Sequence, residues 1–362
     1  MAYDKTTSEL VSKQLLLNIG RLRRNQPPHF TNVSSIAATF DFTFNAGIGP
    51  AMTGDRGYLP MPSIGGSASE NPTITITPME GGEFAQRLLA PFHEQKLAML
   101  LRQGYDVDAL LRLTVAELRV KEKDQEIVHF NRPLDPSGYA MFRRVMAQLS
   151  SIQDRHGLYV EALEIPVTHT LAASSVSAEN LMTLLREPSL KYDSDKQTYQ
   201  FTTIITGRII ISNYDPASLT PEERMRLRFE SEQGPSNEVL LDIRSDRAGG
   251  EVPIHGKLRL RSFFNVLTFI ARGIADEVEY DVAPDPRTPV ISENPVHALQ
   301  IVESQHAAKA PELSAYLDDY HYALAPETGY QWNHKSFSLL YQLFQMTVEP
   351  APLAAPAITI AK

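Results

Sequence analysis

Residues 39–44 are Thr-Phe-Asp-Phe-Thr-Phe, and residues 73–77 are Thr-Ile-Thr-Ile-Thr. In both stretches an apolar side chain alternates with a polar one, which is the period of a β-strand with one buried face. The pattern predicts strands over residues 33–44 and 73–77. The apolar positions, which we expect to flank an interaction arm, are Phe40, Phe42, Phe44, Ile74 and Ile76.

The segment between these strands, residues 45–72, is rich in Gly, Pro and Ser. A connection of this length without secondary structure is unusual inside a compact domain. One interpretation is a disordered hairpin tip. The other is a projecting arm that becomes ordered against a neighbouring subunit, because hairpins and strand edges are common docking elements. The sequence leaves both open.

Further along the chain, short helical and strand patterns follow one another without regular alternation. Residues 80–113 predict three short helices separated at Pro91 and Gly104. The segment 261–274 is apolar almost all round, which is typical of a buried helix. Short strands rich in Thr favour antiparallel or mixed sheets over long parallel units. The sequence therefore predicts an α+β fold with mixed or antiparallel sheets and helices packed on one face.

The other strands and helices are predicted less sharply. Residues 215–234 predict either a short solvated helix or a linker. Strands are expected at 115–130 as a pair, and at 158–167, 198–206, 208–213, 239–243, 252–260, 296–302, 320–324 and 329–332, with helices at 8–24, 135–152, after Ser177 and at 336–346.

Changes in composition predict three units and a tail. The first unit is residues 1–132 and carries the arm at 45–72. The second is a central α+β unit at 133–282. A C-terminal strand–helix segment follows at 283–349, opened by a proline-rich stretch, and the tail at 350–362 is rich in Ala and Pro.

Composition restricts the classes of function. The chain has 362 residues, 43% hydrophobic and 21% charged, so it can bury a substantial core. Its net charge of −9 argues against general nucleic-acid binding, which needs clustered Lys and Arg. It has no cysteine, which rules out disulfides, thiolate metal sites and cysteine nucleophiles. No apolar run approaches the roughly 20 residues of a membrane helix.

Motifs for catalysis are absent from the sequence. It contains no Gly-x-Ser-x-Gly elbow, no phosphate-binding loop and no His-Glu-x-x-His pair. The densest cluster of possible metal ligands is Asp318-Asp319-Tyr320-His321. On a strand, Asp319 and His321 would face the same side. We favour the interpretation that they form the polar start of a strand, and we predict neither a catalytic residue nor a cofactor.

Three arginines lie near the end of the first predicted helix, at Arg21, Arg23 and Arg24. Cations stabilise the negative end of a helix dipole. The favoured interpretation is therefore a solvated helix end, and the alternative is a contact with phosphate or an anionic lipid.

Four stretches carry a resemblance to a known family. They are Gln-Leu-Leu-Leu-Asn-Ile-Gly-Arg-Leu-Arg at 14–23, Asn-Pro-Thr-Ile-Thr-Ile-Thr-Pro at 71–78 with Glu-Phe-Ala at 83–85, Arg-Ser at 261–262, and Lys-Ser-Phe at 335–337. Together they resemble a family of uncharacterised proteobacterial cell-envelope proteins of the lipoprotein type. The resemblance implies a periplasmic, outer-membrane-associated protein with an N-terminal lipid anchor, which here would have been lost with a processed leader. It implies no active site.

We therefore expect a non-enzymatic structural or adaptor component of a bacterial envelope assembly. It would act through protein–protein contacts, as a homo-oligomer or inside a larger complex, with peripheral membrane association through the lost anchor. The alternatives are a metal-assisted hydrolase using Asp319 and His321, and a phage or virion structural subunit. A cytoplasmic location is the alternative to the periplasm.

Overall fold

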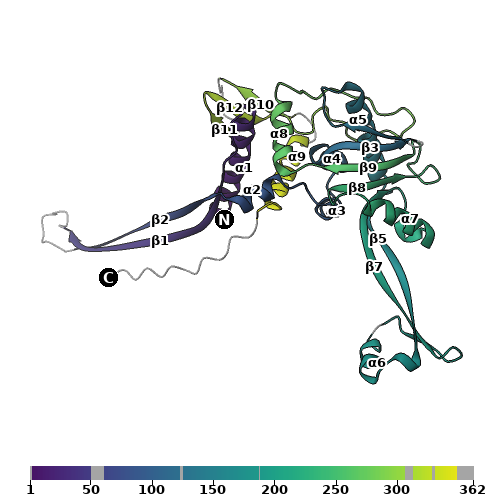
Figure 1. The fold of residues 1–362 in the computed structure, drawn as a ribbon. Coiled ribbons are helices and arrows are strands. Elements are labelled where there is room, and N and C mark those ends of the chain that lie inside the picture. The colour runs from purple at the N-terminus through teal and green to yellow at the C-terminus, as the bar shows by residue number, and fades with distance from the viewer. Residues whose placement is uncertain are drawn as a thin grey trace, which may run out of the picture.

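The computed structural model consists of a body and two long β-arms that leave it in different directions (Figure 1). It describes residues 2–49, 61–122, 125–186, 188–305, 313–327 and 331–348. Within these ranges, residues 2–7, 32–49, 61–76 and 178 are described by their backbone alone. Helices and strands both occur throughout the body, so the predicted α+β fold is confirmed.

Within the described ranges, seven strands form the main sheet of the body, in the order β4-β3-β9-β8-β7-β5, with β6 added to β7. Only the pair β7–β8 is parallel. The strands are β3 (Val115–Glu122), β4 (Gln125–Phe130), β5 (Tyr159–Ala172), β6 (Lys191–Asp193), β7 (Thr198–Ser212), β8 (Glu238–Ile243) and β9 (Ile254–Leu260).

The main core lies on one face of this sheet. Strand residues such as Leu118, Leu241 and Leu258 are buried there against apolar side chains of the helices. The helices that contribute are α1 (Ala2–Arg23), α2 (Gly82–Leu89), α3 (Glu94–Arg102), α4 (Val107–Thr114), α5 (Pro136–Asp154), α8 (Phe263–Gly273) and α9 (Trp332–Gln345). The three helices predicted within 80–113 are all present.

Helix α7 (Pro221–Glu232) lies on the opposite face, over the half of the sheet nearest to β5. Its Leu227 packs with Leu240 and Ile210 in a second, small core, because neighbouring residues of a strand point to opposite faces. The segment 215–234 is thus a helix preceded by a single turn at Pro216–Ser218, and not a linker.

The first arm is a hairpin of β1 (Phe30–Gly49) and β2 (Met61–Met79). The predicted strands at 33–44 and 73–77 are both longer than the alternating pattern, since pairing continues to Gly49 opposite Met61. Much of the segment 45–72 is therefore a paired ribbon. Residues 50–60 lie outside the described residues.

The second arm was not predicted as an arm. β5 and β7 pair along their whole length, from Tyr159 opposite Ser212 to Ala172 opposite Thr198, and carry β6 and the short helix α6 (Ala178–Leu184) near their far end (Figure 1). The two strands expected at 198–206 and 208–213 are a single strand. A Cβ at Gly207 would lie 3.0 Å from the carbonyl oxygen of Leu163, so this position favours glycine.

The C-terminal part forms a small sheet in the order β10-β12-β11, with β10 (Ile301–Ser304), β11 (Ser314–Leu317) and β12 (Tyr320–Leu324). The strand predicted at 296–302 begins only at Ile301. The strand predicted at 329–332 is wrong at Trp332, which begins helix α9; residues 328–330 lie outside the described residues.

The long irregular segment between α8 and β10 is held by buried charges. Arg112 is fully buried and donates to Glu279 at 2.9 Å and to the carbonyl oxygens of Pro295 and Val296. Arg143 binds the same two carbonyls. Strands from the first two predicted units share the main sheet, and the core draws residues from all three units, so the predicted boundaries at 132 and 282 pass through a common sheet and core.

Candidate assembly surfaces

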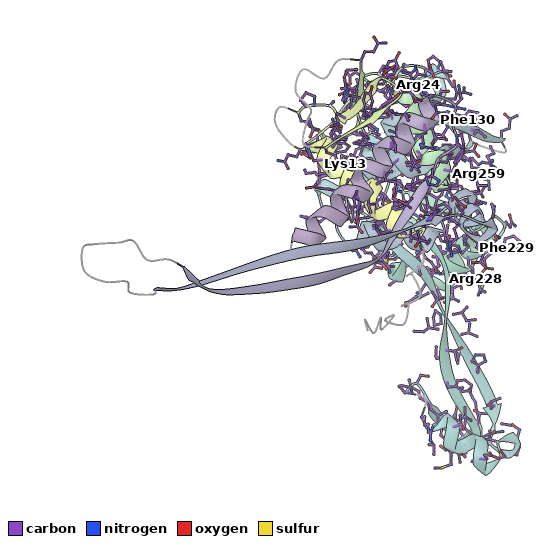
Figure 2. All side chains as sticks on the ribbon, turned by 90° about the vertical axis from the view of Figure 1, so that its left-hand side faces the viewer. Lys13, Arg24, Phe130, Arg228, Phe229 and Arg259 are labelled. Carbon is purple, nitrogen blue, oxygen red and sulfur yellow. The ribbon has the colours of Figure 1, made fainter. Side chains whose placement is uncertain are left out.

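The shaft of the second arm combines exposed apolar side chains with an absence of charge. Residues 165–172 of β5 and 198–207 of β7 contain no Asp, Glu, Lys or Arg. Ile204 is 63% exposed on the shaft, and Met182 and Leu185 of the α6 region are 66% and 61% exposed. Figure 2 shows this arm extending well away from the body. The arm therefore presents apolar surface that no part of its own body covers.

An isolated two-stranded ribbon is marginal in water, because it has no second layer against which to bury its apolar face. The shaft has some internal support. The rings of His169 and Phe201 stack at 5.0 Å, and the Thr203 hydroxyl lies 2.9 Å from Nε2 of His169. These contacts join β5 to β7 but do not cover either face. A covering layer from another molecule would stabilise the ribbon.

Natural proteins protect strand edges with charges, proline, bulges or covering loops. In this arm Pro166 removes one donor from β5, and the Ser189 hydroxyl binds both the backbone N–H and the carbonyl of Thr202 on β7. Charged residues of this arm lie outside the shaft: Glu164 and Arg208 are at the root, and Lys191 and Asp193 are at the far end. The edges are thus protected without charge, which leaves the shaft compatible with a dry contact.

The first arm has a similar sequence character. Of the 39 residues that β1 and β2 comprise (20 in β1 and 19 in β2), only Asp41 and Glu70 are charged. The backbone register places Phe40 opposite Glu70, Phe42 opposite Ala68 and Phe44 opposite Gly66. Ile74 lies opposite Ile36, and Ile76 opposite Val33. The side chains of these five predicted contact residues lie outside the described side chains.

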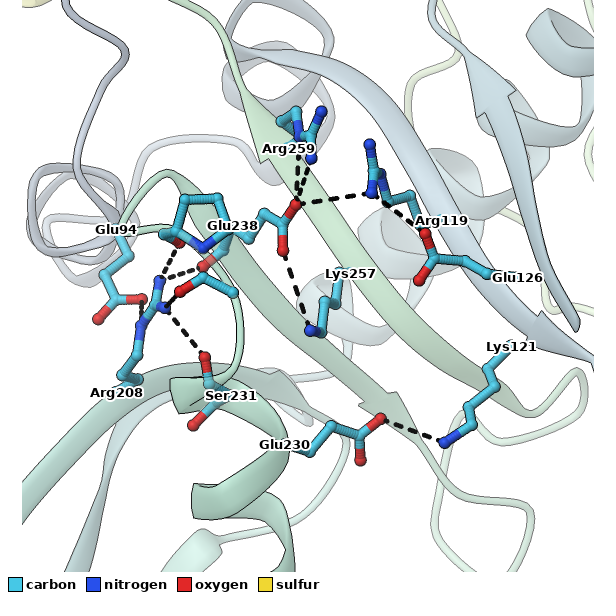
Figure 3. Close-up of polar contacts among 12 residues, drawn as sticks. Glu94, Arg119, Lys121, Glu126, Arg208, Glu230, Ser231, Glu238, Lys257 and Arg259 are labelled. Atoms are coloured by element: carbon cyan, nitrogen blue, oxygen red, sulfur yellow. Dashed lines mark hydrogen bonds and ion pairs between the residues drawn. The ribbon is translucent and has the colours of Figure 1, made fainter. Parts of the chain in front are cut away.

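The root of the second arm is fixed by Arg208 of β7 (Figure 3). Its guanidinium donates to Glu94 of α3 at 2.8 Å and to four carbonyl oxygens: Ser231, Gly234, Pro235 and Glu238. An arginine that uses its whole donor fork in this way positions the elements around it. Arg208 therefore ties the arm to the body through α3, the end of α7 and the start of β8.

The outer face of the sheet beside this root carries a lattice of ion pairs (Figure 3). Glu238 of β8 accepts from Arg259 at 2.7 Å and lies 3.8 Å from Arg119 and 3.9 Å from Lys257. Arg119 also contacts Glu126 of β4 at 3.1 Å. Because each cation has a carboxylate neighbour, this face is not a general anion-binding surface.

A histidine with a carboxylate at each ring nitrogen lies between α7 and the sheet. His255 of β9 has Nδ1 2.9 Å from Asp242 of β8, and Nε2 2.9 Å from Glu230 of α7. Asp242 also accepts hydrogen bonds from the Tyr214 hydroxyl and from Arg244. The hydrogen bond to Asp242 raises the pKa of His255, against the opposing effect of burial, and Glu230 raises it further. Burial opposes the charge on Asp242, yet its three hydrogen bonds lower its pKa to about 2.

An Asp–His pair can act as a general base only when the second ring nitrogen faces a nucleophile. Here Glu230 occupies that nitrogen, so the imidazole bridges two carboxylates, an arrangement that favours its protonated form. It binds α7 to the sheet and holds no open position for a substrate. Sequence reasoning did not find it, because Glu230, Asp242 and His255 belong to three different elements and form no local motif.

Two of the three arginines near the end of α1 are paired within the protein. Arg24 binds Glu303 and the Tyr322 hydroxyl, and its guanidinium lies 3.6 Å from the centre of the Tyr320 ring. Arg23 lies 3.1 Å from Asp276. Among the described contacts, Arg21 makes no ion pair with Asp276 or Glu303. The two paired arginines join α1 to the small sheet and to the segment after α8. A phosphate or lipid that bound Arg23 or Arg24 would therefore have to compete with Asp276 or Glu303.

The geometry assumed for Asp319 and His321 is wrong. Asp318 and Asp319 form the turn between β11 and β12, with φ of 45° and 66°, so Asp319 is not on the strand with His321. Asp319 accepts a hydrogen bond from the Tyr316 hydroxyl at 2.9 Å, and His321 packs its ring on Tyr316 at 4.8 Å. Among the residues that the structure describes, no group of three or more His, Cys, Asp or Glu side chains is arranged to hold a metal ion.

Hollows in the body differ in their lining: Glu279 and His297 line a small one of about 110 Å³, whereas another is lined by arginines. A hollow of about 600 Å³ lies between the end of α1 and α8, and its lining includes Arg23, Phe264 and Arg272 but no histidine among the described residues.

Among the helices of the described residues, none combines the length and the hydrophobicity that a membrane span needs.

Comparison with known proteins gives no relative: no family model, no curated protein and no solved structure matches this chain.

Proposed function

We propose that this protein is a non-enzymatic structural subunit that assembles by docking its two β-arms onto neighbouring molecules, most simply other copies of the same chain. The observation that carries the proposal is the uncharged shaft of the second arm, with Ile204 exposed on it and Leu185 exposed at its far end. Apolar surface of this kind is stabilised by burial, at roughly 25 cal/mol per Å² removed from water. A neighbouring subunit would supply that burial.

Two candidate groups for catalysis are arranged differently from what a hydrolase needs. The best candidate for acid–base chemistry, His255, has a carboxylate at each ring nitrogen. Asp319 and His321, the basis of the hydrolase alternative, are separated into a turn and a strand. The arms therefore offer more support for a binding role than any side-chain cluster offers for catalysis.

We place the protein in the periplasm, associated with the outer membrane, on the family resemblance of its sequence. Membrane association would then come from a lipid anchor near the N-terminus. The test is fractionation of cells that express the complete natural gene, with metabolic lipid labelling. Recovery of unlabelled protein in the cytoplasmic fraction would contradict this location and would leave the assembly proposal intact.

Assembly is tested by shortening each arm in its native register. Thr39 and Asn71 are partners in the first arm, and Val167 and Thr203 are partners in the second. Replacing residues 40–70, or residues 168–202, with Asn-Gly closes each shortened hairpin with a favoured two-residue turn. We expect light scattering to show a loss of oligomers for each shortened chain while circular dichroism shows an intact body. Oligomers of unchanged size in both shortened chains would contradict the proposal.

A single substitution gives a milder test of the same surface. Ile204→Lys places a charge on the shaft and should weaken assembly about tenfold or more, because the cation would have to be buried without a partner. The matched control is Val290→Lys, since Val290 is 96% exposed but lies in the irregular segment of the body. Equal assembly by wild type and Ile204→Lys would show that the shaft is not part of the contact between subunits.

A further inference from the structure

Helix α7 is attached to the sheet mainly through polar contacts. Leu227 is its one fully buried apolar side chain in the described structure, whereas Met225 and Phe229 are 50% and 67% exposed. Phe229 lies at the edge of the body in Figure 2. Arg224 of α7 donates to the carbonyl oxygen of Glu164 on β5. Burial of one leucine contributes about 1.5 to 3 kcal/mol, so Leu227 and the polar contacts of α7 share its attachment to the sheet.

The helix also covers the root of the second arm. Leu227 packs with Leu163 of β5 and Ile210 of β7 in the small core under α7. Loosening α7 would therefore expose this core and reduce the contacts that fix the arm's direction. The position of α7 and the order of the arm root are coupled.

An ionic contact between α7 and the sheet that depends on a titratable cation is the bridge through His255. Its two ring nitrogens lie 2.9 Å from Asp242 and 2.9 Å from Glu230. A protonated imidazole donates from both nitrogens, whereas a neutral one carries a single proton and must present a lone pair to one of the carboxylates. The bridge as built thus needs the charged form.

Charged groups face His255 from each neighbouring element. Asp242 comes from β8 and Glu230 from α7, while Lys121 of β3 lies 3.9 Å from Glu230. Arg244, after β8, binds both Asp242 and Glu223 of α7, and the Tyr214 hydroxyl donates to Asp242. The low pKa of Asp242 keeps it ionised across the range in which a histidine titrates.

We infer that His255 is a pH-sensitive latch: when protonated it holds α7 on the sheet and fixes the root of the second arm, and when neutral it releases α7. The consequence for assembly rests on the proposed function. The latch itself is a property of the single molecule and is measured without assembly.

The direction of the effect follows from the raised pKa of His255. A histidine whose pKa is higher in the folded than in the unfolded protein stabilises the fold fully below its unfolded value of about 6.5. This stabilisation is lost as the pH rises through the folded-state pKa. We therefore expect α7 to be held in mildly acidic solution and to loosen at alkaline pH.

The experiment follows two signals between pH 5.5 and pH 9 in the full chain. Proton NMR of the imidazole gives the titration of His255, and hydrogen exchange gives protection factors for the amides of α7, which correct for the intrinsic effect of pH on exchange. We expect a several-fold loss of protection in α7 with the same midpoint as His255. The amides of α5 should show no such step.

Two variants separate the latch from a merely structural histidine. Glu230→Gln keeps an acceptor for the imidazole but removes a charge, so the midpoint of both signals should move to lower pH. His255→Gln should abolish the step. The matched control is His169→Gln, because His169 contacts Thr203 and Phe201 and no carboxylate among the described contacts, and this variant should keep the wild-type step.

Each outcome decides the proposal. Protection of α7 that stays flat while His255 titrates, a step that survives His255→Gln, or an unmoved midpoint in Glu230→Gln would overturn the latch. If His255→Gln does not fold, the midpoint in Glu230→Gln still decides. Light scattering on the same samples reports assembly separately, so a working latch in a chain that never assembles would contradict only the proposed function.

Discussion

Glu279 is the carboxylate on which the irregular segment after α8 depends. It is buried and accepts hydrogen bonds from Arg112, from the Tyr139 hydroxyl and from the backbone N–H of Ala298. Burial is the largest single effect and disfavours its charge, but Arg112, the backbone N–H of Ala298 and Arg143 together outweigh it, and the pKa of Glu279 is lowered. Removing one member of such a group leaves the others charged, buried and incompletely paired.

Glu279→Gln should therefore lower the free energy of unfolding by about 3 kcal/mol at pH 7, measured by urea denaturation. A lowered pKa gives stabilisation that is present above the unfolded value of about 4.3 and is lost as the pH falls through the folded value. The difference between wild type and variant should therefore shrink below pH 4. The control is Asp285→Asn, which removes an exposed ion pair with Arg287 and should change stability little. Equal effects of the two variants would contradict this account.

The turn between β11 and β12 gives a second test at single residues. Both central residues have positive φ, as the tight type I′ hairpin requires, and Asp319 has φ of 66°. Asp319→Gly should reduce backbone strain by about 0.5 to 1 kcal/mol, offset in part by loss of the hydrogen bond from Tyr316. Asp319→Ala keeps the strain and loses the bond, so it should be the less stable of the two by thermal denaturation. Because both variants lose the side-chain bond, the reverse order would contradict the backbone strain assigned to this position.

At the scale of elements, the sequence pattern predicted helix ends and caps, because these depend on residues that are close together in the chain. Ser177 caps α6 by accepting from the N–H of Asn180, and the three helices within 80–113 end close to Pro91 and Gly104. The second arm could not be predicted in the same way, because its length is set by which strand pairs with which across a long separation in sequence. A usable signal was present in its charge-free strands at 165–172 and 198–207.

The candidate sites were less predictable than the elements. The turn at Asp318–Asp319 shows why: alternation along a strand was assumed where two left-handed residues reverse the chain. The His255 bridge joins residues 13 and 25 positions apart, so only the tertiary fold brings its carboxylates to the ring. Patterns of neighbours in sequence carry no information on such contacts.

Helix α7 allows a prediction that belongs to the element itself. Leu227→Ala removes its one fully buried apolar side chain, and core truncations of this kind cost about 2 to 5 kcal/mol. Because the rest of the helix is solvated, we expect local release and not global unfolding. Limited proteolysis should cut the variant within 221–232 while leaving the body intact. Resistance equal to wild type would mean that the polar contacts alone hold the helix.

For the whole molecule, the second arm and the body should be thermodynamically separable. Among the described side chains, the main core contains no buried residue between Val160 and Ile209. A chain with the second arm shortened should therefore melt within a few degrees of the wild-type monomer in differential scanning calorimetry. A large fall in melting temperature would show that the second arm stabilises its own body.

The character of the arms also predicts how assembly responds to salt. Contacts between uncharged strands are not weakened by screening, and sulfate strengthens the burial of apolar surface. Oligomers measured by sedimentation should therefore persist in 1 M sodium chloride and increase with ammonium sulfate. Dissociation in sodium chloride would assign the contact to the charged face of the sheet instead.

The two arms leave the body in different directions (Figures 1 and 2), and they differ in sequence and in attachment. In the proposed assembly, a molecule with two unlike arms has two or more neighbours, unless the two arms meet each other across a twofold axis. The addition of further copies to such an assembly then stops only when the copies close into a ring. The copy number of such an assembly would be fixed by the geometry at the arm roots, and a change of a few degrees there would convert a closed ring into an open helix.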